Sequence, residues 1–149
     1  SPDFTAIEAK RVALIAESYQ RLSGTPLVPP GGDLVAALWS ASMAIVAHDT
    51  AADPIFFFGN AKALELFEMD FQTFTRFPSR LSAEPVLRDE RARLLERVTR
   101  DGLITDYAGV RISATGRRFR IEQAAVWNLL DASGQRHGQA AAFSRWVPL

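Results

Sequence analysis

The sequence predicts an α+β domain: a five-stranded antiparallel sheet with helices packed on one face, and a helical extension at the N-terminus. Three consecutive strands without an intervening helix are predicted near the C-terminus, at residues 104–113, 118–130 and 139–146. Glycine-containing turns separate these strands, at residues 114–116 and 131–134. Short turns of this kind are typical of strands that pair antiparallel with their neighbours in the chain.

The middle strand, residues 118–130, alternates between two kinds of side chain. A period of two residues indicates a strand with one buried face and one solvated face. The predicted buried face carries Phe119, Ile121, Gln123, Ala125, Trp127 and Leu129. The predicted solvated face carries Arg118, Arg120, Glu122 and Asn128.

A strand pair and several helices precede these three strands. The apolar runs at 44–48 and 55–58, separated by turn residues at 49–54, predict two more strands. Asn60 is placed to cap the helix that follows. The longest helix is predicted at about residues 83–100, because its apolar residues recur at helical spacing.

Residues 1–32 are predicted to form an N-terminal helix and a linker rich in proline and glycine, and residues 33–149 the compact domain. The helix is expected at residues 4–22, and its apolar stripe has to be buried against another surface. The stripe consists of Val12, Ile15, Tyr19 and Leu22. We therefore predict a homodimer that pairs through this helix.

Composition and charge argue against several classes of protein. Of the 149 residues, 48% are hydrophobic, and 17 acidic side chains balance 17 basic ones. The basic excess typical of nucleic-acid-binding proteins is absent, so no nucleic-acid partner is expected. No apolar stretch approaches the ~20 residues of a membrane span, and no signal peptide is recognisable. We therefore expect no membrane association and predict a cytoplasmic location.

No cofactor or metal is predicted. The chain has no cysteine, which removes disulfides, thiolate-bound metals and the photochemistry of cysteinyl-flavin adducts. Its two histidines, His48 and His137, lack the spacing of a metal site. The longest predicted helix contains no His, Cys, Met or Tyr that would serve as an axial ligand of haem. The protein should therefore be colourless and metal-free.

Ten short sequence blocks stand in order between residues 37 and 146. They are 37–39 (ALW), 47–50 (AHDT), 53–54 (DP), 67–68 (FE), 78–85 (PSRLSAEP), 107–113 (YAGVRIS), 115–119 (TGRRF), 121–124 (IEQA), 126–128 (VWN) and 138–141 (GQAA). In these blocks the chain resembles the MEKHLA domain, a PAS-related family, in its stand-alone bacterial form. The resemblance implies a PAS-like fold, a sensory or regulatory role and a ligand position between sheet and helices. It implies no particular ligand.

Five residues form the candidate ligand site: His48, Asn60, Arg111, Gln123 and Trp127. Gln123 is central, because its amide stands in an otherwise apolar strand face and a buried amide needs hydrogen-bond partners. Small residues in the neighbouring strands leave room for a ligand. The alternative is a filled core in which protein groups satisfy the Gln123 amide. No residue is assigned as catalytic.

The adjacent pair His48 and Asp49 suggests acid–base chemistry. Neighbouring residues of a strand point to opposite faces, however, so the favoured interpretation is that Asp49 begins a turn. The predicted function is a PAS-like sensory or regulatory module that binds a small molecule or a protein partner between sheet and helices. Two alternatives stay open: a small cofactor-independent enzyme that uses His48 or a buried carboxylate, and a dimerisation module without a ligand.

Overall fold

The computed structural model describes residues 1–83 and 88–149, with the side chains in these ranges except those of Arg88 and Arg91. Its helices are α1 (Ala6–Ser23), α2 (Leu34–Ser40), α3 (Ala61–Phe67), α4 (Phe71–Phe74), the 3-10 helix η1 (Ser79–Ser82) and α5 (Arg88–Asp101). Its strands are β1 (Ala44–His48), β2 (Phe56–Gly59), β3 (Leu103–Ile112), β4 (Arg118–Leu130), β5 (Arg136–Phe143) and β6 (Arg145–Pro148). Within the described ranges, none of these helices combines the length and the apolar composition needed to cross a membrane.

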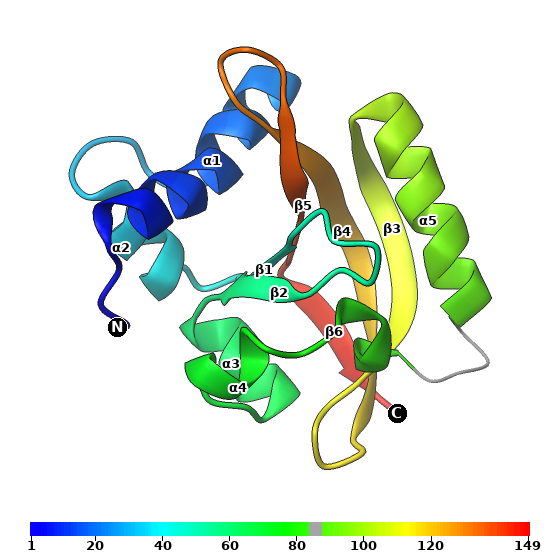
Figure 1. The fold of residues 1–149 in the computed structure, drawn as a ribbon. Helices are drawn as coiled ribbons and strands as arrows, with labels where there is room; N and C mark the ends of the chain where they lie inside the picture. Colours follow the sequence, from blue (N-terminus) through cyan, green and yellow to red (C-terminus); the bar gives the residue numbers. More distant parts are fainter. Residues whose placement is uncertain (84–87) are drawn as a thin grey trace.

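The strands form one antiparallel sheet in the order β2-β1-β5-β4-β3, and β6 pairs with β4 (Figure 1). The predicted α+β class and antiparallel sheet are confirmed, and β4 pairs with both β3 and β5. The start of the longest helix was predicted at residue 83, and residues 84–87 lie outside the described ranges. In the described part, this helix is α5.

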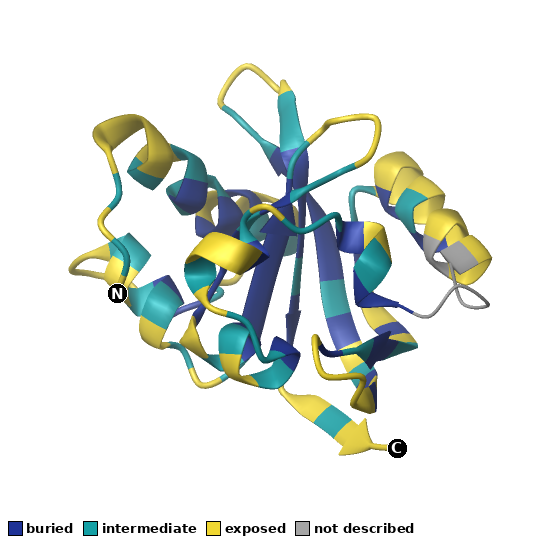
Figure 2. Ribbon diagram, turned by 60° about the horizontal axis from the view of Figure 1, so that its bottom comes forward, coloured by how far each residue is buried: buried dark blue, intermediate teal, exposed yellow. Residues whose placement is uncertain are grey.

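Helices cover both faces of the sheet. Helices α3, α4 and α5 lie on what we call the inner face, and α1 and α2 lie on the outer face (Figure 1). Buried residues follow the central strands, and the exposed residues of the helices lie on their outward sides (Figure 2). The inner core includes Phe56, Phe67, Phe74, Val98 and Ile121. The outer core includes Ile15, Leu38, Phe58, Trp127 and Leu129.

A bulge in β4 decides which side chains face each core. Gln123 has a φ of 49°, a left-handed conformation that interrupts the alternation of the strand. Before it, Phe119 and Ile121 face the inner core, whereas after it Val126 does. Trp127 consequently lies in the outer core. The prediction that Gln123 and Trp127 share one buried face with Ile121 is therefore wrong.

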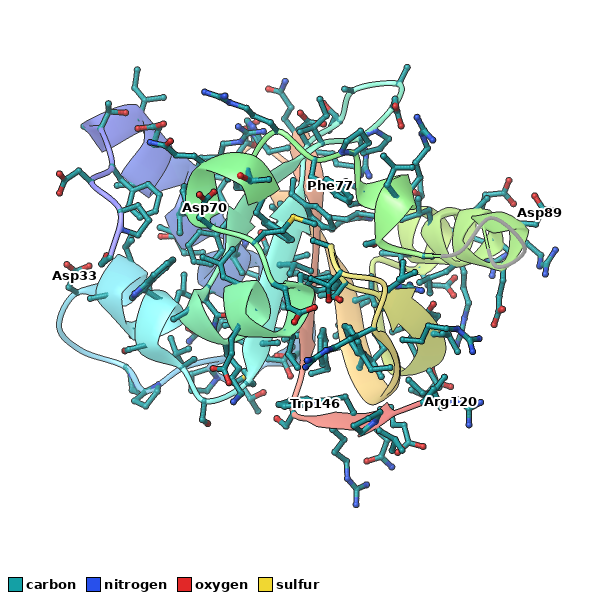
Figure 3. The ribbon with its side chains drawn as sticks, turned by 90° about the horizontal axis from the view of Figure 1, so that it is seen from below. Asp33, Asp70, Phe77, Asp89, Arg120 and Trp146 are labelled. Atoms are coloured by element: carbon teal, nitrogen blue, oxygen red, sulfur yellow. The ribbon has the colours of Figure 1, made fainter. Side chains whose placement is uncertain are left out.

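The strand predicted at residues 139–146 is two strands, β5 and β6, which are separated at Ser144. The first pairs with the C-terminal half of β4 and the second with its N-terminal half. Trp146 of β6 is aligned with Ile121 of β4, at the end of the sheet that Figure 3 shows from below. The break adds a sixth strand to the predicted five.

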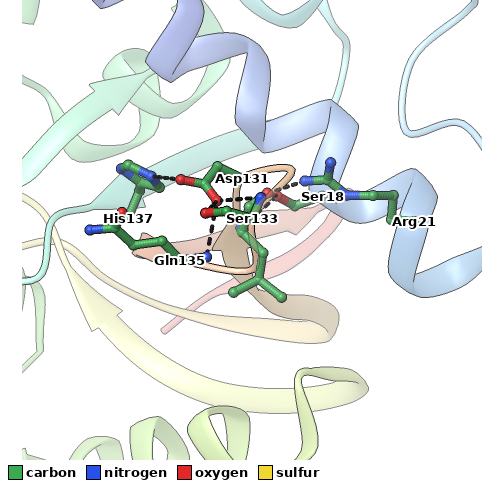
Figure 4. Close-up of polar contacts among 7 residues, drawn as sticks. Ser18, Arg21, Asp131, Ser133, Gln135 and His137 are labelled. Atoms are coloured by element: carbon green, nitrogen blue, oxygen red, sulfur yellow. Dashed lines mark hydrogen bonds and ion pairs between the residues drawn. The ribbon is translucent and has the colours of Figure 1, made fainter.

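Helix α1 is fixed to the chain's own sheet (Figure 4). The Ser18 hydroxyl accepts a hydrogen bond from the Leu130 backbone N–H at 2.9 Å, and Arg21 donates to the carbonyl of the same residue. About one turn earlier in the helix, the Ile15 carbonyl accepts a hydrogen bond from Trp127 Nε1 at 3.0 Å. These contacts join α1 to the C-terminal half of β4.

The apolar stripe of α1 is used inside the chain. Val12 and Ile15 are buried in the outer core, and the ring of Tyr19 lies edge-on to Trp127 with 5.0 Å between ring centroids. The homodimer through this helix stays a prediction. The unburied stripe no longer argues for it, because most of the stripe packs against the chain's own sheet. A dimer would have to use another surface of α1.

Candidate functional site

A cavity of about 50 Å³ lies between the inner face of the sheet, η1 and α5. One ordered water needs roughly 10–15 Å³, so the cavity has room for a few non-hydrogen atoms. Its wall is mostly apolar and includes Val46, Phe56 and Val126. Polar side chains from the strands also line it, and these are His48, Tyr107, Arg111 and Gln139.

A row of polar residues crosses the inner face where the cavity meets β5. His48 of β1 is aligned with Gln139 of β5, which is aligned with Asn128 of β4. All three are buried. Gln139 Nε2 donates to Asn128 Oδ1 at 3.1 Å and to Thr99 Oγ1 of α5 at 3.3 Å. The Gln139 amide therefore connects two strands and α5.

The orientation of the Gln139 amide follows from its neighbours. The Val98 carbonyl can only accept, and Asn128 Nδ2 donates to it at 3.1 Å. Arg136 can only donate, and its Nε donates to Asn128 Oδ1 at 3.2 Å. Because Asn128 is fixed from both ends, the Gln139 nitrogen has to face Asn128 Oδ1. Gln139 Oε1 is then left without a hydrogen-bond donor in the described part of the chain, although the residue is only 1% exposed.

Arg111 places a positive charge at the cavity. It is 8% exposed, and its Nη2 donates to the Tyr107 hydroxyl at 2.6 Å. Its Nη1 donates to the Val110 carbonyl at 2.8 Å. Among the described residues, no carboxylate forms an ion pair with it. The cavity therefore has a buried cation at one wall.

A glycine makes the arrangement of Tyr107 and Arg111 feasible. Tyr107, Gly109 and Arg111 follow at intervals of two on β3, so their Cα positions share one face. A Cβ atom at Gly109 would lie 2.2 Å from the Tyr107 hydroxyl oxygen. Because no side chain occupies this space, the tyrosine ring lies over Gly109, and its hydroxyl reaches the Arg111 guanidinium.

His48 lines the cavity, but the adjacent carboxylate does not form a dyad with it. His48 Nδ1 lies 2.9 Å from the Asp49 backbone carbonyl. The Asp49 carboxylate instead accepts hydrogen bonds from the backbone N–H groups of Ala51 and Ile55, at 3.1 and 3.0 Å. The turn interpretation of Asp49 is confirmed. In the described ranges no Asp or Glu is buried, so the enzyme alternative finds no buried carboxylate there.

Three of the five candidate residues lie away from the cavity. Asn60 is fully buried, and its side chain accepts from Ile45 N and Ala63 N and donates to the Leu38 and Met43 carbonyls. It therefore caps α3, as predicted, and fastens α2 and β1 to it.

Gln123 and Trp127 are the other two. Gln123 is exposed, and its Oε1 accepts from Arg145 Nη1 at 2.9 Å, so the prediction of a buried Gln123 amide is wrong. Trp127 is buried, but on the outer face. Of the predicted set, only His48 and Arg111 meet at the cavity.

Sequence reasoning missed Gln139 and Tyr107. A signal for Gln139 was present, because it is a polar residue at the start of an otherwise small and apolar run, 140–143. Its alignment with His48 depends on the pairing of β1 with β5, which joins segments far apart in the sequence. Local alternation carries no information on that pairing.

The sequence profile of the MEKHLA domain matches residues 9–148. This chain belongs to the MEKHLA domain family. The match begins within α1 and so extends beyond the predicted domain boundary at residue 33. The homeobox-leucine zipper proteins ATHB-9 and ATHB-14 of Arabidopsis thaliana are 29% identical over 147 residues and 28% identical over 142 residues. Each match covers 91% of this chain and 17% of the relative, so this chain spans about a sixth of the length of these relatives.

Solved structures of similar fold belong to the PAS and light-oxygen-voltage classes. A PAS domain from Colwellia psychrerythraea has a TM-score of 0.61 at 15% identity, over 76% of this chain and 92% of that one. An RNA-binding light-oxygen-voltage receptor has a TM-score of 0.63 at 17% identity, over 80% of this chain and 36% of that one. A light-oxygen-voltage domain from work on a flavin analogue has a TM-score of 0.58 at 18% identity, over 79% of this chain and 85% of that one. Identities this low show the fold alone, and they confirm the predicted PAS-like fold of this MEKHLA domain.

Several blocks of the MEKHLA sequence pattern meet as structural contacts. The Glu68 carboxylate accepts from the Ser113 hydroxyl at 2.6 Å and from the Thr115 hydroxyl. These hydrogen bonds, that of Ser113 first, hold the pKa of Glu68 below its usual value. Asp53 and Arg80 form an ion pair at 3.0 Å. In these contacts the pattern residues stabilise the fold, and they lie outside the cavity wall.

Proposed function

We propose that this MEKHLA domain is a sensory module that binds a small molecule in the cavity of its inner face. The observation that carries the proposal is Gln139 Oε1, a buried acceptor at the cavity without a described donor. Buried polar atoms in folded proteins nearly always have a partner. Leaving one without a partner costs about 1–3 kcal/mol, and a ligand that donates a hydrogen bond removes this cost.

The position of Gln139 also supports a sensory role. Its amide nitrogen is bonded to Thr99 Oγ1 of α5 and to Asn128 of β4. A ligand bound to its oxygen would act on a side chain that already connects the sheet to a covering helix. Occupation of the cavity would therefore change how firmly α5 is held to the sheet.

The test begins with native mass spectrometry of the protein purified from its own host, to detect a retained small molecule. That molecule is then added to wild type, Gln139→Leu and Gln123→Leu, and the midpoint of thermal unfolding is measured. We expect the ligand to raise the midpoint in wild type and Gln123→Leu, and much less in Gln139→Leu. Equal shifts in all three proteins would remove Gln139 from the site. No retained molecule, together with no stabilisation by any metabolite in a broad screen, would contradict the proposal.

A further inference from the structure

We infer that Arg111 and Tyr107 form a subsite for a small carboxylate, of the size of formate or acetate, at the β3 end of the cavity. The inference goes beyond the proposed function, because it concerns another group of side chains and a separate occupant. Arg111 is aligned with Phe119, near the start of β4. Gln139 is aligned with Asn128, near the end of that strand. The subsite therefore does not include Gln139, and neither proposal depends on the other.

Arg111 is a cation that the fold removes from water. The residue is 8% exposed. In the described part of the chain, no other Arg or Lys is buried, and neither is any Asp or Glu. Burial of a charge is costly unless an opposite charge and hydrogen bonds replace its hydration. The fold therefore creates a requirement for an anion at this position.

The carboxylate just past the end of β3 does not meet this requirement. Glu68 accepts hydrogen bonds from the hydroxyl groups of Ser113, at 2.6 Å, and of Thr115. Its ion pair is with the exposed Arg117, at 3.6 Å. Within the described ranges, no carboxylate forms an ion pair with Arg111. The charge of Arg111 is thus left for a bound anion to balance.

The guanidinium and the Tyr107 hydroxyl offer hydrogen-bond donors side by side. Arg111 Nη2 donates to the Tyr107 oxygen at 2.6 Å, and its Nη1 donates to the Val110 carbonyl at 2.8 Å. The remaining N–H groups of the guanidinium have no acceptor among the described residues. The tyrosine oxygen accepts from Arg111, so its own O–H has to donate in another direction, where no described residue accepts it. Because the two donor groups contact each other directly, one small anion can bind both.

The shape and the surroundings of these donors favour a carboxylate. A carboxylate is planar and binds a guanidinium through two parallel hydrogen bonds, and its oxygen atoms have further lone pairs for the tyrosine O–H. Phe67 and Ile121 belong to the same cavity wall, and apolar surroundings strengthen hydrogen bonds between charged groups. The cavity volume of about 50 Å³ limits the anion to a few non-hydrogen atoms.

Wild-type protein alone can test the chemical class. Isotope-labelled protein is titrated with sodium acetate, acetamide and sodium chloride, and NMR follows the Arg111 Nε–H and the Gly109 amide. Acetamide has the shape of acetate without its charge, and chloride has the charge without the planar pair of oxygen atoms. We expect acetate to shift both signals to saturation and to bind more tightly than chloride or acetamide. Equally tight binding of acetamide or chloride would overturn the inference, as would the absence of shifts with acetate.

Substitutions then test the two residues. Tyr107→Phe removes only the hydroxyl and should weaken acetate binding on the order of 10-fold, because one hydrogen bond to a charged group is lost. Arg111→Gln removes the charge and should weaken it further. Arg120→Gln is the matched control: this arginine of β4 is exposed (Figure 3), so the affinity should not change.

A second variant of Arg111 keeps the test valid if Arg111→Gln does not fold. Arg111→Lys retains the positive charge but lacks the planar pair of N–H groups, so it should bind acetate more weakly than wild type. Circular dichroism establishes that each variant is folded. Wild-type affinity for acetate in the folded Arg111 variants would overturn the assignment of Arg111, and wild-type affinity in Tyr107→Phe would overturn that of Tyr107.

The outcomes separate this subsite from the proposed function. A retained molecule whose stabilising effect depends on Gln139, together with no acetate-induced shift at Arg111, would overturn the subsite and leave the proposed function in place. Acetate binding that requires Arg111, together with equal thermal shifts in wild type and Gln139→Leu for a retained molecule, would support the subsite and remove Gln139 from the proposed site.

Discussion

The arrangement of Tyr107, Gly109 and Arg111 shows how one missing side chain organises a site. The tyrosine ring occupies the space where a Cβ atom of residue 109 would stand, and the guanidinium carbon of Arg111 lies 5.3 Å from the ring centroid. The hydroxyl and the aromatic face of Tyr107 therefore both contact the cation. This contact holds the charge at the cavity wall instead of letting it extend into solvent.

We predict that Gly109→Ala destabilises the domain by about 1–3 kcal/mol, because the added methyl group overlaps the tyrosine hydroxyl. The ring then has to move, and its hydrogen bond to Arg111 is lost. Urea unfolding measures the change in the free energy of unfolding. In the double variant Gly109→Ala/Tyr107→Ala the overlap is absent. The double variant should therefore lose less unfolding free energy than the two single variants lose together. Strict additivity would show that residue 109 does not act through Tyr107.

At the scale of elements, local patterns predicted the strands well and their partners less well. The bounds predicted for β1 and β4, residues 44–48 and 118–130, agree with the structure, because alternation and turn residues act over a few neighbouring positions. The face assignment within β4 failed after Ile121. A non-glycine residue in a left-handed conformation, Gln123, leaves no signal in a hydropathy pattern.

The candidate site shows the same division. His48 and Arg111 of the predicted set do line the cavity, although the residue on which that set was centred, Gln123, does not. Gln139 was missed because its role depends on its alignment with His48 and Asn128 across three strands. Trp127 was assigned to the wrong face by the same bulge. What sequence reasoning lacked was the long-range register, which tertiary packing determines.

The hairpin between β4 and β5 carries a pH-dependent contribution to stability. The Asp131 carboxylate accepts from the Ser133 hydroxyl at 2.6 Å and lies 2.8 Å from His137 Nε2 (Figure 4). It also accepts from the backbone N–H groups of Ser133 and Gln135. These contacts hold the pKa of Asp131 well below its usual value, and the hydrogen bond from the Ser133 hydroxyl has the largest effect.

Because the pKa of Asp131 is lower in the folded than in the unfolded state, its contribution is present above the unfolded value, about 3.9, and is lost as the pH falls from there through the folded value. We predict that Asp131→Asn lowers the midpoint of thermal unfolding at pH 7 and that the difference from wild type shrinks below about pH 4. Thermal unfolding followed by circular dichroism at several pH values measures this. Ser133→Ala removes one donor and should give a smaller difference of the same sign. A difference that is constant from pH 7 to pH 2 would refute the role of Asp131.

On the scale of the whole molecule, the sheet is buried on both faces, and each face has its own core. The inner face and α5 enclose the cavity. The outer face is covered by α1 and α2 and contains no cavity-lining side chain among its largest buried residues, Trp127, Phe58 and Leu38. Residues 1–32 thus complete the core of the domain (Figure 1).

We predict that deleting residues 1–32 lowers the free energy of unfolding by at least about 3 kcal/mol, because Val12 and Ile15 each contribute roughly 1.5–3 kcal/mol by burial on the outer face. The deletion also removes the acceptor of the Trp127 indole N–H, which donates to the Ile15 carbonyl at 3.0 Å. Urea unfolding and binding of a hydrophobic dye measure the loss of packing. The control is deletion of residues 1–3, which leaves the N-cap residue Thr5 and all of α1 in place and should change neither. Sedimentation of the same proteins separates packing from assembly. A truncated protein that unfolds like wild type but is a monomer where wild type is a dimer would support the homodimer and contradict the packing role of α1.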